Sequence, residues 1–276
     1  GTTTEPPGVG NAINYVPTEF ELTSEFIYHT PCDGCIVDFT GDYVPELKVF
    51  RLPAREESNI ETVTSKANSY TPSGSALLVA EHTQDSNFGA QLDSVSGELG
   101  GYGITKVYLD EVAANNGLTL PGDINEVVAL AQTQMIGEIN GGQRLVMFDG
   151  HGSPGAWTFN MLFTDSEAGN LTNSSPNVVI PLACYTTYYE SPGTESLADQ
   201  LLFNPSGGSV VVSGAAVLSS LVDNGLFAER ILEKMCTGKN LAEAVFETKV
   251  ENATVTDQVI NWDTIGNGFA TIDSCY

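Results

Sequence analysis

Apolar residues are spaced along the chain in two different patterns. Short, nearly continuous apolar runs predict strands that are buried on both faces. These strands are expected at 75–80, 104–109, 144–148, 178–182 and 209–213. Between them, apolar residues recur at the spacing of a helix. Helices are expected at 58–70, 88–99, 124–139, 197–202, 225–235 and 241–251. The alternation predicts an α/β fold with a mainly parallel sheet covered by helices on both faces.

Local signals refine the ends of some elements. Ser58 and Glu61 have the spacing of a capping box, and Asp123 is placed to cap the helix that follows it. Residues 36–39 alternate between apolar and polar as a strand does. These signals depend on a few neighbouring residues, whereas the sheet is predicted from the whole chain.

The chain divides into a lead-in and a domain. Residues 1–40 are expected to be an irregular lead-in, with many Gly, Pro and Thr residues in its first half. Residues 41–276 are expected to form the functional domain. The chain starts at Gly1 and shows no signal peptide, so we expect it to be a trimmed part of a longer precursor.

The charge is strongly negative and excludes two kinds of partner. With 35 acidic and 10 basic residues, the formal net charge is -25. Such a surface repels the phosphates of nucleic acids and of anionic membranes. No apolar stretch is long enough to span a bilayer. We therefore expect an acidic protein that neither binds nucleic acid nor inserts into a membrane.

Cysteines occur at five positions, so at least one thiol is unpaired within the chain. Cys32 and Cys35 form a C-x-x-C pair, but the strand-like residues that follow do not suit a thioredoxin motif. Without a second C-x-x-C pair, zinc is not expected either. The pair is interpreted as a small local disulfide or as two inert thiols, and we assign no metal ligands.

Two strand ends carry residues that suit nucleophilic catalysis. His151 lies between Gly150 and Gly152 after one predicted strand, and Cys184 follows the next. If these strands are parallel neighbours, both residues leave the sheet at one edge, where a histidine can act as base for a thiol. The N–H groups of Gly152 and Cys184 are then candidates for an oxyanion hole. The residues alone leave open that Cys184 is a buried apolar residue and His151 a structural one.

At this point the sequence resembles the gingipain family of cysteine peptidases over roughly residues 40–250. The matching motifs are 41–46 with 51–53, 148–153 with 156–157, 182–184 with 196–202, and 207–214. The resemblance implies a caspase-like three-layer αβα sandwich and hydrolysis of peptide bonds through a thioester acyl-enzyme. Phe50 departs from the family pattern, which usually has glycine there. The Gly-Asp-Pro segment that usually ends the family domain is also absent.

The resemblance also implies further site residues. Glu81, which follows the strand 75–80, lies where relatives place an acidic residue that orients the histidine. A solvated acid at a strand end is the other reading of Glu81. Arginine-specific relatives hold the substrate guanidinium with an aspartate, whose place falls near Phe88. Asp85 and Leu218 are the other pocket candidates, and strict arginine specificity is not expected.

We therefore expect a secreted or cell-surface cysteine endopeptidase with a Cys184–His151 dyad, acting on proteins or peptides. A transpeptidase, resembling sortases in its reaction, would pass the acyl group to an amine rather than to water. A non-catalytic caspase-like interaction module and a plain acidic binding domain are the alternatives from other classes. The presence of both Cys184 and His151 argues against the interaction module, and the binding domain would leave the paired, glycine-flanked motifs unexplained. No cofactor is expected to be required, and a structural calcium ion is left open without assigned ligands.

Overall fold

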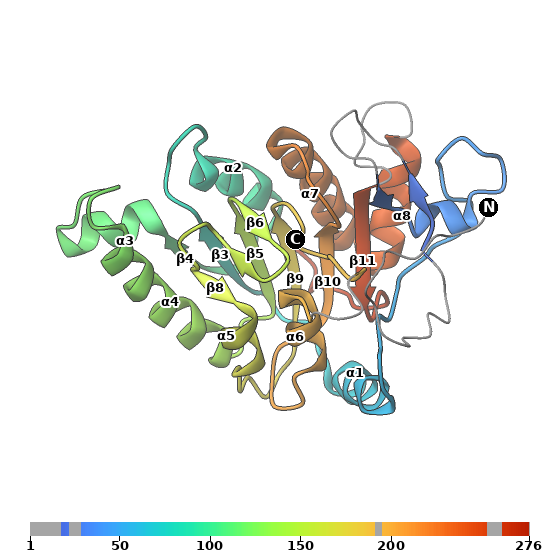
Figure 1. The fold of residues 1–276 in the computed structure, drawn as a ribbon, viewed down its shortest axis with the longest axis horizontal. Helices are drawn as coiled ribbons and strands as arrows, with labels where there is room; N and C mark the ends of the chain where they lie inside the picture. The colour runs from blue at the N-terminus through green and yellow to red at the C-terminus, as the bar shows by residue number, and fades with distance from the viewer. Residues whose placement is uncertain (1–17, 22–28, 191–194, 253–260, 276) are drawn as a thin grey trace.

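The computed structural model describes residues 18–21, 29–190, 195–252 and 261–275. Much of the expected lead-in, residues 1–17 and 22–28, lies outside the described residues. A six-stranded sheet crosses the described part in the order β11-β10-β9-β5-β3-β4. Helices cover both of its faces (Figure 1), so the architecture is the three-layer α/β sandwich that the sequence predicts.

Five strands of this sheet are parallel neighbours, as the apolar runs predict. They are β3 (Ser75–Ala80), β4 (Gly103–Tyr108), β5 (Leu145–Asp149), β9 (Asn177–Leu182) and β10 (Ser209–Ala215). Strands β5, β9 and β10 are buried along their whole length, because helices cover both of their faces. The sixth strand, β11 (Trp262–Gly266), pairs antiparallel with β10 at one edge and was not predicted.

One face of the sheet packs against five helices. They are α1 (Glu57–Ser69), α3 (Leu109–Asn116), α4 (Ile124–Asn140), α5 (Asp165–Gly169) and α6 (Leu197–Phe203). Their buried apolar residues form one core cluster with the strands. In α1, Lys66 is almost fully buried, and its Nζ donates to the carbonyls of Leu201 and Leu202, each at 2.8 Å. This contact fastens α1 to the end of α6.

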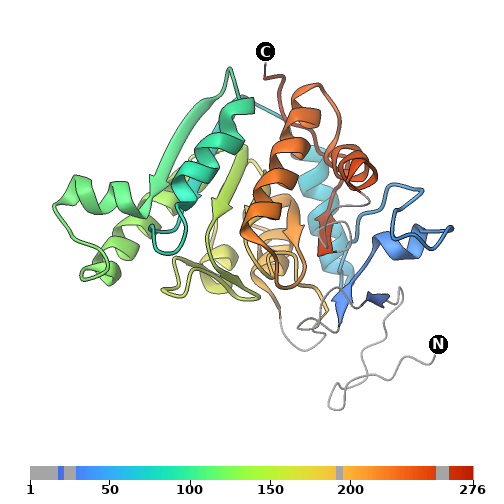
Figure 2. The ribbon, with the colours of Figure 1, turned by 90° about the horizontal axis from the view of Figure 1, so that it is seen from above.

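The other face packs against α2 (Phe88–Val95), α7 (Leu221–Cys236) and α8 (Leu241–Glu251). Their buried residues form the second core cluster. Helices α2 and α7 lie side by side (Figure 2), and Gln91 Nε2 donates to the Leu221 carbonyl at 2.7 Å. This places the first turns of both helices on the side of the sheet where the carboxyl ends of β3, β5 and β9 lie.

Some local predictions are wrong. Helix α1 begins at Glu57, and the N–H of Glu56 donates to Asn59 Oδ1 at 3.2 Å, so the cap does not consist of Ser58 and Glu61. Asp123 does occupy the cap position of α4, but its carboxylate accepts the N–H of Thr119 at 2.8 Å and caps no helical amide.

The predicted strand at 36–39 is also wrong. Residues Gly34–Val37 form a 3₁₀-helix, and a disulfide joins Cys32 to Cys35 across its start. A second disulfide, which we did not predict, joins Cys236 at the end of α7 to Cys275. Cys184 is the free cysteine, as the odd number of cysteines requires. Upstream, β1 (Phe20–Glu21) and β2 (Thr30–Pro31) form a small antiparallel pair.

A buried ion cluster joins the segment before α1 to the sheet. The guanidinium of Arg51 binds both carboxylate oxygens of Asp33, with Nε at 2.9 and 2.8 Å, and lies 4.9 Å from the centre of the Tyr189 ring. The Tyr189 hydroxyl donates to Asp263 Oδ2 at 3.1 Å, and Lys249 Nζ lies 3.8 Å from Asp263 Oδ1. The cluster therefore holds the segment that follows Cys184 against β11 and α8.

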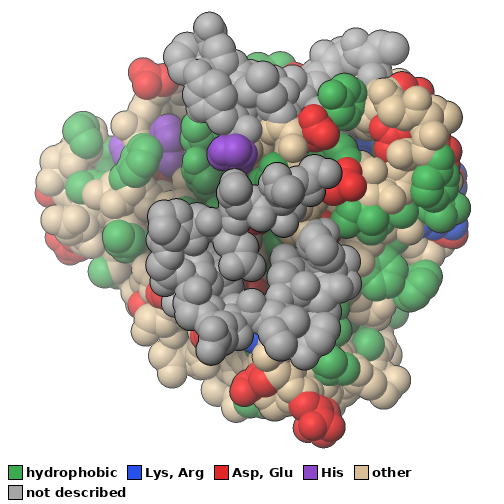
Figure 3. Space-filling model, turned by 45° about the vertical axis from the view of Figure 1, so that its right-hand side comes forward, with side chains coloured by type: hydrophobic (Ala, Val, Ile, Leu, Met, Phe, Trp, Pro, Cys, Tyr) green, Lys and Arg blue, Asp and Glu red, His purple; other side chains and the backbone are tan. Residues whose placement is uncertain are grey.

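The outer surface reflects the acidic composition. Acidic side chains are scattered over the face in Figure 3 rather than gathered in one patch. Within the described residues, no helix has both the length and the apolar character needed to cross a bilayer.

Candidate active site

Three predicted catalytic residues meet at one edge of the sheet. Strands β5 and β9 are parallel and in register, with Asp149 opposite Leu182. His151 follows β5 by two residues and Cys184 follows β9 by two residues, so both emerge at the same level. Glu81 follows β3 on the other side of β5, and its N–H donates to the carbonyl of Asp149 at 3.0 Å.

The glycines beside His151 let its loop contact both partners. A Cβ atom on Gly152 would lie 2.3 Å from the carbonyl oxygen of Cys184. Gly150 has a φ of 157°, and a Cβ atom there would lie 2.7 Å from Cβ of Glu81. Because any side chain at either position would collide, glycine is needed for this close approach. The relative position of the two strand-end loops is thus set by backbone contact.

A buried carboxylate holds His151 twice. Glu81 is almost fully buried, and its Oε2 accepts the backbone N–H of His151 at 2.7 Å and lies 2.9 Å from Nδ1 of the ring. With Nδ1 held by a carboxylate acceptor, the proton of the neutral ring lies on Nδ1 and Nε2 is the nitrogen that can accept one. The imidazole is therefore oriented as a general base requires.

The thiol of Cys184 contacts the loop between β10 and α7. The N–H of Ser219 donates to Cys184 Sγ at 3.4 Å, and Ser219 Oγ lies 3.7 Å from the same sulfur. Asn224, which is buried in α7, donates through Nδ2 to Ser219 Oγ at 2.9 Å. Sequence reasoning missed Ser219, because only the folded chain brings it to the cysteine.

The dyad is not closed by a direct hydrogen bond. Among the described residues, no hydrogen bond joins Cys184 Sγ to a ring nitrogen of His151, and the N–H of Cys184 has no acceptor. Catalytic hydrogen bonds are often long in a site without substrate. The arrangement leaves the thiol partly exposed and an N–H group beside it available to a ligand.

Asp149 is a second buried carboxylate at this edge. Its side chain is fully buried, and neither oxygen makes a well-formed hydrogen bond to the described residues. Burial raises the pKa of Asp149 to about 8; the N–H of Gly150 opposes this rise, and the negative charge of Glu81 adds to it. At neutral pH, Asp149 therefore carries a proton.

This protonation predicts a pH-dependent difference in stability. The native pKa of Asp149 lies above the value of 3.8 for a free aspartate, so the native state binds the extra proton between about pH 4 and pH 8. The stability that Asp149 contributes is present below that window and is lost as the pH rises through it. Asp149→Asn mimics the protonated acid, so we expect it to melt progressively higher than the wild type as the pH increases. A difference in melting temperature between the two proteins that stays constant from pH 4 to pH 9 would contradict the raised pKa of Asp149.

The three pocket candidates lie in different settings. Phe88 is buried at the start of α2, and its ring meets the His151 ring edge-on at 5.5 Å between centres. Leu218 is 44% exposed and directly precedes Ser219. Asp85 is exposed in the loop after β3 and has no ion pair or hydrogen bond among the described residues. The structure therefore brings Phe88 and Leu218 to the site, but it does not bring Asp85 into contact with the dyad.

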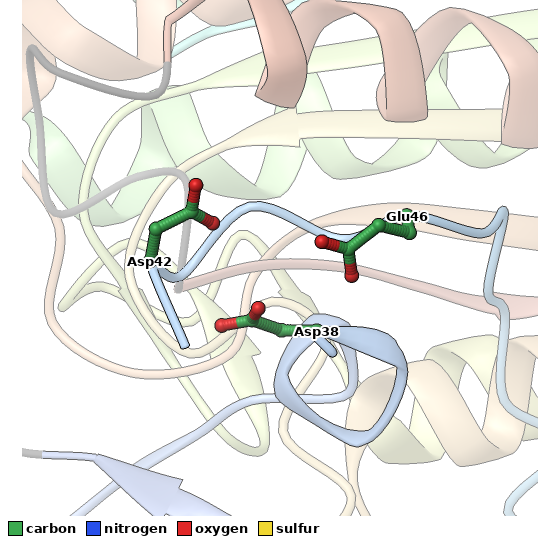
Figure 4. Close-up of side chains that lie close together, drawn as sticks. All are labelled: Asp38, Asp42 and Glu46. Carbon is green, nitrogen blue, oxygen red and sulfur yellow. The ribbon is translucent and has the colours of Figure 1, made fainter. Parts of the chain in front are cut away.

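A group of exposed acids is the other arrangement that could bind a cation. Asp38, Asp42 and Glu46 each offer a carboxylate oxygen, and these oxygens lie within 4.8 Å of one another (Figure 4). Asp38 Oδ1 already accepts the N–H of Gly41 at 2.7 Å, and Glu46 Oε2 accepts that of Phe39 at 2.6 Å. These bonds close the turn and explain the cluster, so we assign no metal to it.

Comparison with known protein families shows to which family the chain belongs. The model of peptidase family C25 matches residues 1–267. The chain belongs to peptidase family C25. This is the gingipain family of cysteine peptidases, as the motifs around His151 and Cys184 predict. No curated protein sequence matches the C25 chain.

Solved gingipain structures share the fold. The crystal structure of the Arg-specific cysteine proteinase gingipain R has a TM-score of 0.70 and 17% identity, covering 88% of the C25 chain and 60% of its own. The complex of Porphyromonas gingivalis RgpB pro- and mature domains gives 0.69 and 16%, covering 87% and 60%. At these identities the likeness shows the caspase-like fold alone. The C25 chain spans about three fifths of the length of these relatives.

Proposed function

We propose that this C25 chain is a secreted cysteine endopeptidase in which Cys184 is the nucleophile and His151 the base. The main observation behind the proposal is that Glu81 Oε2 forms hydrogen bonds with both the backbone N–H and Nδ1 of His151. These bonds lie at the sheet edge that also presents Cys184. A structural histidine has no need of a buried carboxylate that fixes its tautomer. Two disulfides support an oxidising, extracellular setting.

The reaction follows from the groups in place. His151 Nε2 takes the thiol proton as Cys184 Sγ forms a bond to the carbonyl carbon of the substrate. The N–H groups of Gly152 and Cys184 donate to the oxygen that becomes negative. The carbon–nitrogen bond then breaks, His151 returns its proton to the leaving amine, and a thioester to Cys184 remains. Water, deprotonated by His151, attacks the thioester and releases the acid and the thiol.

An electrophilic peptide probe tests the nucleophile directly. The protein is treated with a peptidyl acyloxymethyl ketone, and the label is mapped onto the five cysteines by mass spectrometry. We expect label on Cys184 alone, and none on that residue after prior alkylation with iodoacetamide. Cleavage of peptides without labelling of Cys184, or labelling of another cysteine, would refute the assignment.

Glu81 is proposed to orient His151 without being indispensable. Glu81→Gln keeps the shape of the side chain and removes its charge, so we expect turnover to fall about tenfold to a thousandfold, or about 1.4–4 kcal/mol. Asp199→Asn is the matched control, because Asp199 is equally buried and pairs with Arg55 away from the dyad. Unchanged turnover in Glu81→Gln, or an equal loss in the control, would place Glu81 outside the site.

The pocket candidates support the proposal that this peptidase lacks strict arginine specificity. Phe88 and Leu218 offer no carboxylate to a guanidinium, and Asp85 is solvent-exposed. The net charge still attracts cationic peptides, but salt screens that attraction. We therefore expect a cleavage profile whose preference for basic residues weakens at high salt. A profile dominated by arginine at both salt levels, and lost in Asp85→Ala, would contradict this and identify Asp85 as the specificity residue.

A further inference from the structure

A short hairpin beside the candidate dyad presents apolar side chains to solvent. After His151 the chain forms a small sheet from β6 (Gly152–Ser153), β7 (Ala156–Trp157) and β8 (Phe163–Thr164). At the tip between β7 and β8, Phe159 is 75% exposed and Met161 is 59% exposed. Large apolar side chains contribute nothing to the core when they are exposed in this way, so their position calls for another explanation.

The tip is held in a defined shape. Trp157 at its base is buried and stacks on Phe148 with 4.5 Å between ring centres. The N–H of Thr158 donates to the carbonyl of His151 at 2.8 Å, and the N–H of Leu162 donates to the carbonyl of Trp157 at 3.0 Å. The hairpin is thus tied to the core and to His151, which fixes the place where its tip is presented.

The backbone of the tip adopts conformations that ordinary residues avoid. Thr158 has a φ of 60° and Met161 a φ of 58°, both in the left-handed region. Such conformations persist when the surrounding structure imposes them, and they are common at functional sites. Here they turn the chain so that Phe159 faces the imidazole.

Phe159 lies against the ring of His151. The two ring centres are 4.7 Å apart and the planes are tilted by 33°. Phe88 contacts the same imidazole edge-on, and Glu81 occupies Nδ1. The ring is therefore enclosed by Phe88, Phe159 and Glu81, while its side chain as a whole remains 41% exposed. Part of the His151 side chain therefore stays open to solvent.

The proposed reaction indicates which part of the substrate lies beside the exposed part of the His151 ring. His151 returns a proton to the leaving amine, which must come within about 3 Å of Nε2. The side chain of the residue that carries this amine branches two bonds further on, about 2.5 Å away. It therefore begins within reach of a ring that lies 4.7 Å from the imidazole.

We propose that Phe159, together with Met161, forms a binding site for an apolar side chain on the residue that follows the cleaved bond. The inference rests on the proposed peptidase function and adds to it a substrate preference on the leaving-group side. The site is apolar, lies beside the group that protonates the leaving amine, and contains no charged side chain at its tip. An aromatic ring and a flexible thioether suit aliphatic and aromatic partners.

A cleavage profile of the full chain tests the proposal. Denatured casein is digested, and mass spectrometry records which residue follows each cleaved bond. We expect apolar residues to be favoured there by the wild type. Phe159→Ala should reduce that preference about threefold to tenfold, the effect of one lost aromatic contact, while Phe159→Leu should retain most of it. Phe269→Ala is the matched control, because Phe269 is 66% exposed and its ring pairs with that of Phe50, with 5.2 Å between centres.

Acyl transfer gives a second, independent readout. During casein digestion, leucinamide or glycinamide is added, and each competes with water for the thioester. We expect leucinamide to be incorporated in preference to glycinamide by the wild type and by Phe269→Ala, and the two amides to become nearly equal in Phe159→Ala.

The outcomes separate this inference from the proposed function. No apolar preference in the wild type, or a uniform loss of turnover in Phe159→Ala with an unchanged profile, would overturn the binding site, because Phe159 would then only pack against His151. No cleavage of casein by wild-type protein that labels at Cys184 would instead contradict the peptidase proposal.

Discussion

Cys184→Ala is expected to abolish peptidase activity, lowering turnover by about 10⁴-fold or more. Alanine cannot form the bond to the substrate carbon, and no other thiol of the chain is unpaired. The fold should be almost unaffected, because the sulfur contacts Ser219 only at 3.4 Å or more. Turnover of a peptide substrate and a thermal melt of the same preparation measure both effects.

The control for this variant must show that truncating another side chain of the same loop does not by itself abolish turnover. Thr187→Ala changes a buried residue of the same loop, whose hydroxyl donates to the carbonyl of Gly214 at 3.0 Å. It should lower the melting temperature more than Cys184→Ala does while leaving measurable turnover. Wild-type activity in Cys184→Ala would falsify the assignment of the nucleophile.

His151→Ala is expected to lower turnover by about 10³-fold to 10⁶-fold. Without the imidazole, no group held by Glu81 remains to take the thiol proton or to protonate the leaving amine. The alkylation rate of Cys184 by iodoacetamide at neutral pH should fall as well, because the thiolate is the form that reacts. Stopped assays of turnover and labelling provide the two measurements.

His29→Ala is the matched control, because its ring contacts Phe20 at 6.1 Å between centres and takes no part in the Glu81 arrangement. It should change neither rate. If Cys184 is alkylated with the same pH profile in His151→Ala and in the wild type, the two residues do not act as a dyad.

The sheet could be predicted because its strands are buried on both faces. Strand β3 was predicted with its bounds, and β5 and β9 to within a residue. Strand β11 was missed because its sequence is not an apolar run. Asp263 is used in the buried ion cluster, and Thr264 bonds Ser213 Oγ at 2.8 Å, so polar residues fill inward positions. Helix α3 was missed because it begins directly after β4, without a loop to mark the change.

The site was predictable only where the chain itself carries the signal. Glycine-flanked His151 and strand-end Cys184 can be recognised from neighbouring letters. Ser219 and Phe159 become part of the site through hydrogen bonds and ring contacts between distant segments. Asp149 lies within the histidine motif, but only the structure shows that it is a buried acid without a well-formed hydrogen bond. Local sequence therefore identifies reacting groups better than the groups that surround them.

The burial of some basic side chains changes the charge of the surface that is exposed to solvent. Lys66 and Lys249 are among the 10 basic residues, yet both are almost fully buried, and Arg51 is largely so. Among the described residues, two of these three groups form ion pairs with Asp33 and Asp263. The charged groups at the outer surface are thus mainly carboxylates, which attract small cations from the medium. Those cations weaken the repulsion between neighbouring carboxylates, so the ionic composition of the medium becomes a determinant of how closely two copies can approach.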